Sequence, residues 1–325
     1  MLARFFVGVS FAALLAGPLS AQSLDMTPTS DRILSDPTYL PLKGEFLGDS
    51  SYGYSHNSAS FSDSTGAGIA NSTRHLSTLR QSFAYGVTDD LTISISEGYG
   101  FSGATQTTTA AGVSNNSLSG WADPTIGVTY RLLDQRNNPA SLDLIGHYSP
   151  DAFSAHPAGA GEDGSIARGG PQADFGLGIG RQTKAFTIRG SVTATYNGRI
   201  NESIPVTGTS NSVAAFWVPS IGIQTQTRLT PRLSFDLAGS YNFNGSPVAV
   251  NGLTGIQHTE NLGDYETIKT GLNYHFIPNR LVGSLNYTPA FHQDASFTFP
   301  SNAALDFSRA NSENNFGVSL LYTFK

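Results

Sequence analysis

The sequence predicts an all-β protein, specifically a transmembrane antiparallel β-barrel of about 12 strands with short periplasmic turns and long extracellular loops. Three observations predict this fold. Apolar residues recur at alternate positions from residue 44 to 324, the connections alternate in length, and aromatic residues gather at both ends of the strands. Charged residues make up 13% of the chain, which is about half of the share usual in soluble domains. Few charges and many aromatic residues are typical of outer-membrane barrels.

The first 21 residues have the pattern of an export signal. Arg4 precedes an apolar run over residues 5–16, and Leu19, Ser20 and Ala21 form a small-residue cleavage motif. A membrane-spanning helix would need roughly 20 apolar residues, and this run is shorter. We therefore expect residues 1–21 to be a signal peptide and the bacterial outer membrane to be the destination.

Residues 22–43 form an N-terminal segment on the periplasmic side, ahead of the barrel domain predicted over residues 44–325. Ser30 or Asp31 would cap a short helical turn that ends before Pro37. Two interpretations are open: a flexible lead-in, or a plug that enters the pore. The lead-in is the favoured interpretation.

Twelve segments with a period of two follow, and each is long enough to cross a membrane, since a tilted strand needs roughly 9–11 residues. An even number of strands is the rule for bacterial single-chain barrels. The predicted strands cover residues 44–56, 73–87, 91–102, 121–133, 140–150, 171–181, 185–197, 213–229, 233–245, 264–277, 281–292 and 313–324.

The connections between these strands alternate between short and long. Short connections, such as residues 88–90 and 278–280, suit periplasmic turns. The long ones are rich in Gly, Ser, Thr, Asn and Ala and suit extracellular loops; they cover residues 57–72, 103–120, 151–170, 198–212, 246–263 and 293–312.

The last strand carries an apolar stripe at alternate positions and ends on Phe324, followed by Lys325. Such a strand suits the closing edge of an outer-membrane barrel. We expect the partners to be outer-membrane lipid and, through this strand, the barrel assembly machinery. Two residues do not fit the lipid-facing pattern. Glu97 shares the parity of Ile95, where a carboxylate would face lipid, so we expect a β-bulge to turn it inward; Gln81 is a similar misfit.

Positions of the opposite parity should line the lumen, and they carry charges of both signs. These charges either line a narrow conduit for solutes, which is the favoured interpretation, or pair across the interior and fill it. Gly176, Gly178 and Gly180 form an inward row that leaves room for lumen contents or for large side chains. The candidate residues for the solute path are Arg131, Asp143, His147, Arg189, Asp236 and Lys269.

The sequence predicts no enzyme and no catalytic residue. His147 and Ser149 lie two apart on one strand, as a base and a nucleophile would, but they should face the lumen without an oxyanion hole nearby. Cysteine is absent, the seven histidines have no metal-ligand spacing, and no phosphate-binding glycine loop occurs, so we expect no metal and no cofactor. The formal net charge of −6 argues against nucleic acid as a partner.

Residues 119–133 resemble a pattern in one family of outer-membrane transporters. The segment Ser-Gly-Trp-Ala-Asp-Pro-Thr-Ile-Gly-Val-Thr-Tyr-Arg-Leu-Leu is similar to the Gly-x-x-Asp…Tyr-Arg-Leu motif of the family called MetA-pathway of phenol degradation. The turn at residues 86–91 is also similar. Ala122 departs from the motif, where Gly is common. The resemblance implies uptake of small, often aromatic or hydrophobic, compounds.

The predicted function is therefore an outer-membrane channel for the passive uptake of small molecules, and the resemblance implies aromatic or hydrophobic ones. The alternative is a barrel that transports nothing and acts as a surface scaffold or adhesin through its long loops.

Overall fold

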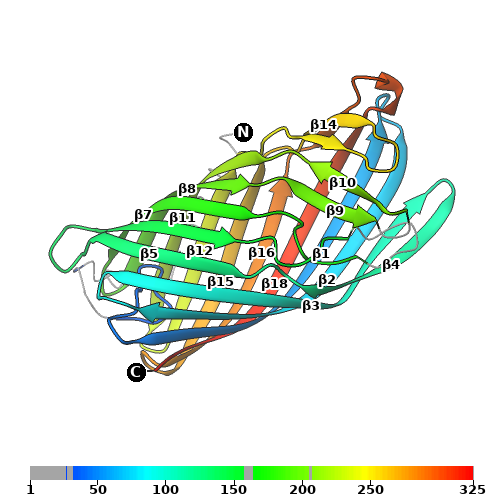
Figure 1. Cartoon of the computed structure of the whole chain (residues 1–325). Coiled ribbons are helices and arrows are strands. Elements are labelled where there is room, and N and C mark those ends of the chain that lie inside the picture. Colours follow the sequence, from blue (N-terminus) through cyan, green and yellow to red (C-terminus); the bar gives the residue numbers. More distant parts are fainter. Residues whose placement is uncertain (1–26, 28–31, 157–163, 205–206, 325) are drawn as a thin grey trace.

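The structure, a computed structural model, describes residues 27, 32–156, 164–204 and 207–324 (Figure 1). Twelve antiparallel strands form a closed barrel, because the first strand pairs with the second on one side and with the last on the other. Closure pairs both edges of each of these twelve strands, which is the condition for backbone polar groups to be satisfied in a bilayer. The predicted fold class is confirmed.

The twelve strands run in chain order around the barrel, each paired with its sequence neighbours. They are β1 (Phe46–Asp63), β2 (Gly68–Gly86), β3 (Leu91–Thr109), β5 (Thr125–Leu133), β6 (Ser141–Ser149), β7 (Gln172–Gln182), β8 (Phe186–Asn197), β11 (Phe216–Thr230), β12 (Leu233–Asn242), β15 (Tyr265–Ile277), β16 (Leu281–His292) and β18 (Phe307–Phe324).

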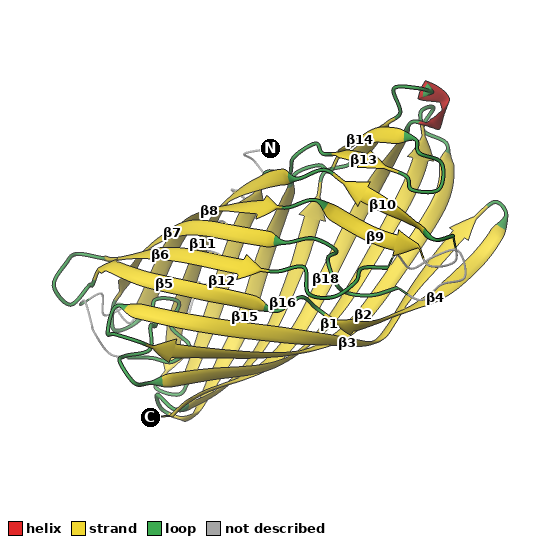
Figure 2. Cartoon of the chain, in the orientation of Figure 1, coloured by secondary structure: helices red, strands yellow, loops and turns green. Residues whose placement is uncertain are grey.

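Much of the sequence that was predicted as long loops is β-structure. β1, β2, β3 and β18 continue past their predicted ends, and six further strands extend the wall at the long-loop end (Figure 2): β4 (Gly112–Trp121), β9 (Ile200–Ile204), β10 (Thr209–Val213), β13 (Val248–Val250), β14 (Gln257–Asn261) and β17 (Ala295–Thr298). Strands wetted on both faces need no apolar alternation, so the period of two does not reveal them.

The outward face carries the predicted apolar stripe. Phe316, Val318, Leu320 and Phe324 are exposed, as are Ile93 and Ile95 on β3. At the short-turn end the aromatic rings meet across the seam of the barrel: the ring centroids of Phe46 and Phe324 lie 5.4 Å apart. An outer band of apolar side chains between aromatic rows matches the profile of a bilayer.

The expectation that a β-bulge turns Glu97 inward is wrong. The register between β2 and β3 runs unbroken from Gly86–Thr92 to Ser77–Phe101, so Glu97 pairs with Gln81 and stays on the outward parity of Ile95 and Tyr99. The register shift between β3 and β4 falls later, between Gly100 and Gly103. The cost of one outward carboxylate is smaller than the cost of breaking the backbone hydrogen bonds that β3 forms with β2 and β5.

The segment before β1 lies at the end of the barrel where the C-terminus is marked (Figure 1). Its residues 33–45 are joined to the barrel by backbone bonds such as Gly44 N–H to Gly86 O, at 2.8 Å. Among the described residues, no helix is long and apolar enough to cross a membrane. The predicted signal peptide, residues 1–21, lies outside the described residues, as do Ser30 and Asp31.

Candidate functional site

Residues 35–38 cross the interior of the barrel at the short-turn end. Ser35 lies beside His275 of β15, with 3.2 Å between Ser35 Oγ and His275 Nε2, and its carbonyl accepts from the amide of Gln226 on β11. Three residues further on, the carbonyl of Thr38 accepts from Arg131 of β5 at 2.7 Å. Residues 35–38 are therefore hydrogen-bonded to the inner wall of the barrel, and we call the segment of residues 32–45 that contains them the plug.

Asp36 is the central anchor of this plug, and it is 5% exposed. Its carboxylate accepts hydrogen bonds from the hydroxyl of Thr187 on β8 and, at 3.1 Å, from the amide of Gln182 on β7. The guanidinium of Arg228 on β11 lies 3.8 Å away. A buried carboxylate is tolerated when donors and a cation satisfy it in this way.

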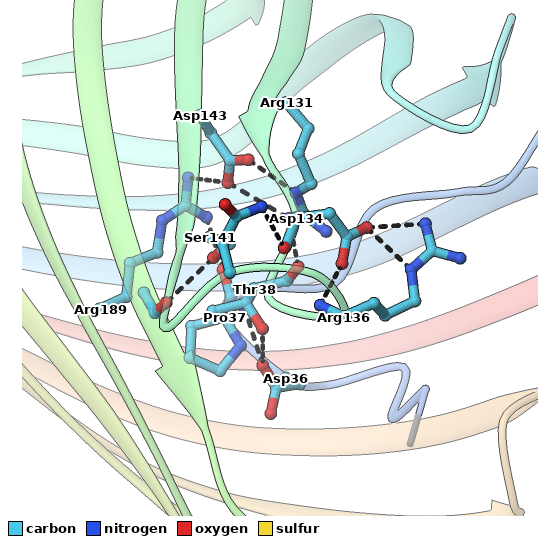
Figure 3. Close-up of polar contacts among 11 residues, drawn as sticks. Asp36, Pro37, Thr38, Arg131, Asp134, Arg136, Ser141, Asp143 and Arg189 are labelled. Carbon is cyan, nitrogen blue, oxygen red and sulfur yellow. Dashed lines mark hydrogen bonds and ion pairs between the residues drawn. The ribbon is translucent and has the colours of Figure 1, made fainter. Parts of the chain in front are cut away.

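Three of the six candidate residues form one cluster against the plug (Figure 3). Asp143, 2% exposed, accepts from Arg131 Nε at 2.8 Å and from an amino group of Arg189 at 3.2 Å. Each guanidinium also donates to a plug carbonyl, Arg189 to Pro37 O and Arg131 to Thr38 O. At this end of the barrel the charges therefore pair along one side of the inner wall, from β5 to β8, and hold the plug.

The inward glycines of β7 make room for this cluster. A methyl group on Gly180 would come within 2.4 Å of the Thr38 side chain, and one on Gly178 within 2.7 Å of the Arg189 guanidinium. Side chains at these positions would displace either the plug or the arginine. The glycine row predicted from the sequence therefore accommodates both lumen contents and a large side chain.

The other three candidate residues also face inward but do not join this cluster. His147 Nδ1 lies 3.9 Å from Asp174 on the neighbouring strand. Asp236 accepts hydrogen bonds from Gln226 at 3.0 Å and Asn273 at 2.7 Å. Lys269 on β15 is exposed to the interior.

A second cluster fixes the plug where it joins β1. Glu45, with its side chain 8% exposed, pairs with Arg32 and accepts from the backbone N–H of Leu42 and the hydroxyl of Tyr39. Burial works to raise the pKa of Glu45, but the hydrogen bonds from Arg32 and its neighbours outweigh burial and lower the pKa. Burial also raises the pKa of the Tyr39 hydroxyl.

At the long-loop end, Asp123 holds the 151–170 connection against the barrel. Its carboxylate accepts three backbone hydrogen bonds: from Ala152 at 2.9 Å, Phe153 at 3.0 Å and Arg168 at 2.8 Å. Two residues before Arg168, the Ile166 side chain lies against the inner wall. A methyl group on Gly100 would come within 2.9 Å of that side chain. This connection therefore narrows the interior at the long-loop end.

Aromatic rings line the inner wall above this point. Phe297 of β17 stacks on Phe307 of β18 with centroids 4.3 Å apart, and the Arg309 guanidinium lies 5.3 Å from the Phe297 ring centre. Lower down, Tyr265 stacks on His292 at 5.1 Å. Rings and cations on one wall suit aromatic solutes and their anions.

His147 and Ser149 contact other groups and not each other. The Ser149 hydroxyl is 3% exposed and donates to the carbonyl of Pro124 at 2.9 Å, while His147 faces Asp174. No group of three or more metal-ligating side chains converges among the residues that the structure describes.

The sequence did not point to the plug anchors Asp36, Thr187, Gln182 and Gln226. Their partners lie 146 to 191 residues away along the chain, and one of them, Ser35 O, is a backbone carbonyl, which carries no sequence signature. An acidic residue directly before a proline, in a segment rich in polar residues, was the available signal.

Comparison with known proteins adds solved structures of the same architecture. An outer-membrane channel from Pseudomonas putida F1 is 12% identical, with 91% of this chain and 99% of that chain aligned at a TM-score of 0.60. The transport unit of the autotransporter AIDA-I from Escherichia coli is also 12% identical, with 98% of each chain aligned at a TM-score of 0.53. The fold is that of an outer-membrane β-barrel.

The toluene transporter TodX of P. putida is 14% identical over 89% of this chain and 93% of its own, with a TM-score of 0.46. No protein-family model and no curated protein matches the chain. The resemblance of residues 119–133 to the MetA-pathway family therefore stays a prediction.

Proposed function

We propose that the protein is a bacterial outer-membrane channel for the passive uptake of small aromatic or hydrophobic molecules. The observation that carries this proposal is a closed barrel whose inner wall is polar and charged, with residues 35–38 held in its short-turn end by hydrogen bonds. Hydrogen-bonded contacts of this kind exchange with water at modest net cost, so the plug is a removable barrier.

The choice of solute rests on the aromatic rings that face inward at the long-loop end, and on the family resemblance of residues 119–133. A solute would meet these rings first and then Lys269, His147 and Asp236. Arg131, Asp143 and Arg189 act lower down and hold the plug that the solute must pass. The terminal strand, whose last outward residue is Phe324, is the proposed contact for the barrel assembly machinery.

The test is solute flux into liposomes that contain the purified mature protein. We expect benzoate to enter faster than into empty vesicles, and faster still with Asp36→Asn, because the amide holds Thr187 and Arg228 less tightly than the carboxylate. Asp306→Asn, at the opposite end, is the matched control and should leave the rate unchanged.

The alternative is a scaffold that transports nothing. No flux above empty vesicles for the wild type, for Asp36→Asn and for a variant lacking residues 32–43 would reject the channel and favour that scaffold.

A further inference from the structure

The outer wall of the barrel contains a hollow with a volume of about 1170 Å³. It lies over seven neighbouring strands, from β3 through β2, β1, β18, β16 and β15 to β12, and Trp121 at the end of β4 lines it beside β3. Its apolar lining residues have the outward parity of the lipid-facing stripe, and they include Leu79, Leu285, Val318 and Leu320. The hollow therefore opens toward lipid and not toward the interior.

Glu97 lines this hollow, and its position there is unusual. Register places Glu97, Gln81 and Ser50 in one row across β3, β2 and β1, all on the outward face. The other outward carboxylate on the twelve described strands, Glu266, pairs with Tyr241 and Phe291 at the long-loop end. A carboxylate between the aromatic rows is costly unless a proton or a partner neutralises it.

The polar neighbours of Glu97 form hydrogen bonds with one another and not with Glu97. The Ser50 hydroxyl donates to the Gln81 carbonyl oxygen, and the Gln81 amide donates to the Tyr322 hydroxyl at 3.1 Å. Among the described residues, none donates a hydrogen bond to the Glu97 carboxylate or forms an ion pair with it. Its acceptor capacity is therefore available to a group from outside the chain.

Two aromatic rings stand beside the carboxylate. Tyr99 lies two residues along β3 on the same face, and Trp121 pairs with it, with ring centroids 5.0 Å apart and planes at 62°. Both rings line the hollow. A carboxylate next to aromatic faces is the combination that recognises an ammonium group, through charge and through cation–π attraction.

We propose that this hollow binds lipophilic amines, with the ammonium group at Glu97 and the hydrocarbon body along the apolar lining. The ammonium neutralises the carboxylate, and the body replaces lipid in the hollow. A fatty acid would be repelled, and an alcohol would gain only a neutral hydrogen bond. A second copy of the chain is a poorer occupant, because a concave surface is not complementary to itself across a twofold axis.

The chain provides its own control for this site. Tyr196 and Trp217 form a second Tyr–Trp pair on the outward face, also with centroids 5.0 Å apart. The position two residues before Tyr196 is Ala194, where Tyr99 has Glu97, and Trp217 does not line the hollow. These are the two tryptophans of the chain, so each is observed alone when the other is replaced by Phe.

The experiment measures quenching of tryptophan fluorescence in phosphatidylcholine vesicles by 11-bromoundecylamine, with 11-bromoundecanol and 11-bromoundecanoic acid for comparison. In Trp217→Phe, which reports on Trp121, we expect the amine to quench saturably at a concentration about tenfold or more below that of the alcohol. Adding Glu97→Gln should move the amine curve onto the alcohol curve. In Trp121→Phe, which reports on Trp217, the two probes should quench alike, and adding Ala194→Glu should make the amine the stronger one.

The proposal is overturned if Glu97→Gln leaves the amine curve of Trp121 unchanged, or if Trp217 prefers the amine without Ala194→Glu. Failure of all probes to reach Trp121, together with a cross-linked dimer through the hollow, would also overturn it and assign the surface to a second copy. These outcomes are independent of benzoate flux, so they do not bear on the channel function.

Discussion

At the scale of single residues, Asp143 joins the two arginines that hold the plug. It is 2% exposed and lies between two guanidinium groups whose side chains are 12% and 20% exposed. Removing one partner of a buried ion pair leaves a charge without compensation, at a cost of about 3–5 kcal/mol. We expect Asp143→Asn to lower the free energy of unfolding by about this amount, measured by urea titration in detergent.

Asp134→Asn is the matched control for that measurement. Asp134 pairs with Arg136 within the same exposed turn, and the Arg136 side chain is 50% exposed. Exposed pairs contribute about 1 kcal/mol or less. If the two variants lost equal free energy of unfolding, the buried cluster would contribute no more to stability than an exposed ion pair.

Glu45 makes the attachment of the plug depend on pH. Its pKa is lowered in the folded protein, because hydrogen bonds from Arg32, Leu42 and Tyr39 outweigh burial. Its contribution to docking is therefore complete above the unfolded pKa of about 4.3 and is lost as the pH falls through the lower folded value. The chain has no cysteine, so Lys43→Cys provides a single site for a nitroxide label.

We expect the label at position 43 to become mobile in electron paramagnetic resonance spectra as the pH falls through the lowered, folded-state pKa of Glu45. In Glu45→Gln the label should be mobile at every pH. A label that is equally immobile at neutral pH in Glu45→Gln and in the wild-type background would contradict this role.

At the scale of elements, the 151–170 connection depends on one side chain. Asp123 accepts three backbone hydrogen bonds from it, and Arg168 supplies one of them. We expect Asp123→Ala to release the connection, so that trypsin cleaves the folded protein after Arg168. The Asp151 side chain, in the same connection, forms no hydrogen bond with the described residues. Asp151→Ala should therefore stay uncut, and equal cleavage of both variants would contradict the anchor.

The sequence predicts strand pairing well wherever one face is apolar and the other is wet. All six candidate residues have the inward parity that was predicted from alternation, and Gly180 was recognised as a position that leaves space. The extensions beyond the barrel were not predicted, because strands such as β10 carry polar residues on both faces. Glu97 was placed on the wrong face, because a register is set by the whole ladder and not by its least favourable member.

The plug was not the favoured interpretation for a similar reason. Its anchors are joined by contacts between distant parts of the chain, and periodicity within one segment carries no information about them. The sequence does contain the barrel residues that accommodate the plug. Gly180 leaves space for Thr38, and Arg131 and Arg189 donate hydrogen bonds to the carbonyls of Thr38 and Pro37. These roles can be recognised only when residues 35–38 are in place.

At the scale of the whole molecule, the outward apolar band determines how the protein behaves in solution. Large apolar side chains are at least half exposed on widely separated strands, among them Ile126 of β5, Val192 of β8 and Leu285 of β16. Such a surface exceeds the apolar patches of soluble monomers. We expect the purified mature chain to aggregate when detergent is removed, as measured by size-exclusion chromatography, whereas a monodisperse monomer in plain buffer would contradict the membrane assignment.

The plug also sets an order of events during biogenesis. Ser35 and Asp36 are bound by Gln182 and Thr187 from the middle of the chain and by His275 from near its end. The residues that are synthesised first therefore cannot dock until β7, β8 and β15, which are synthesised later, have taken their places in the barrel. The plug is therefore the last segment to dock, and it docks only after the barrel around it has closed.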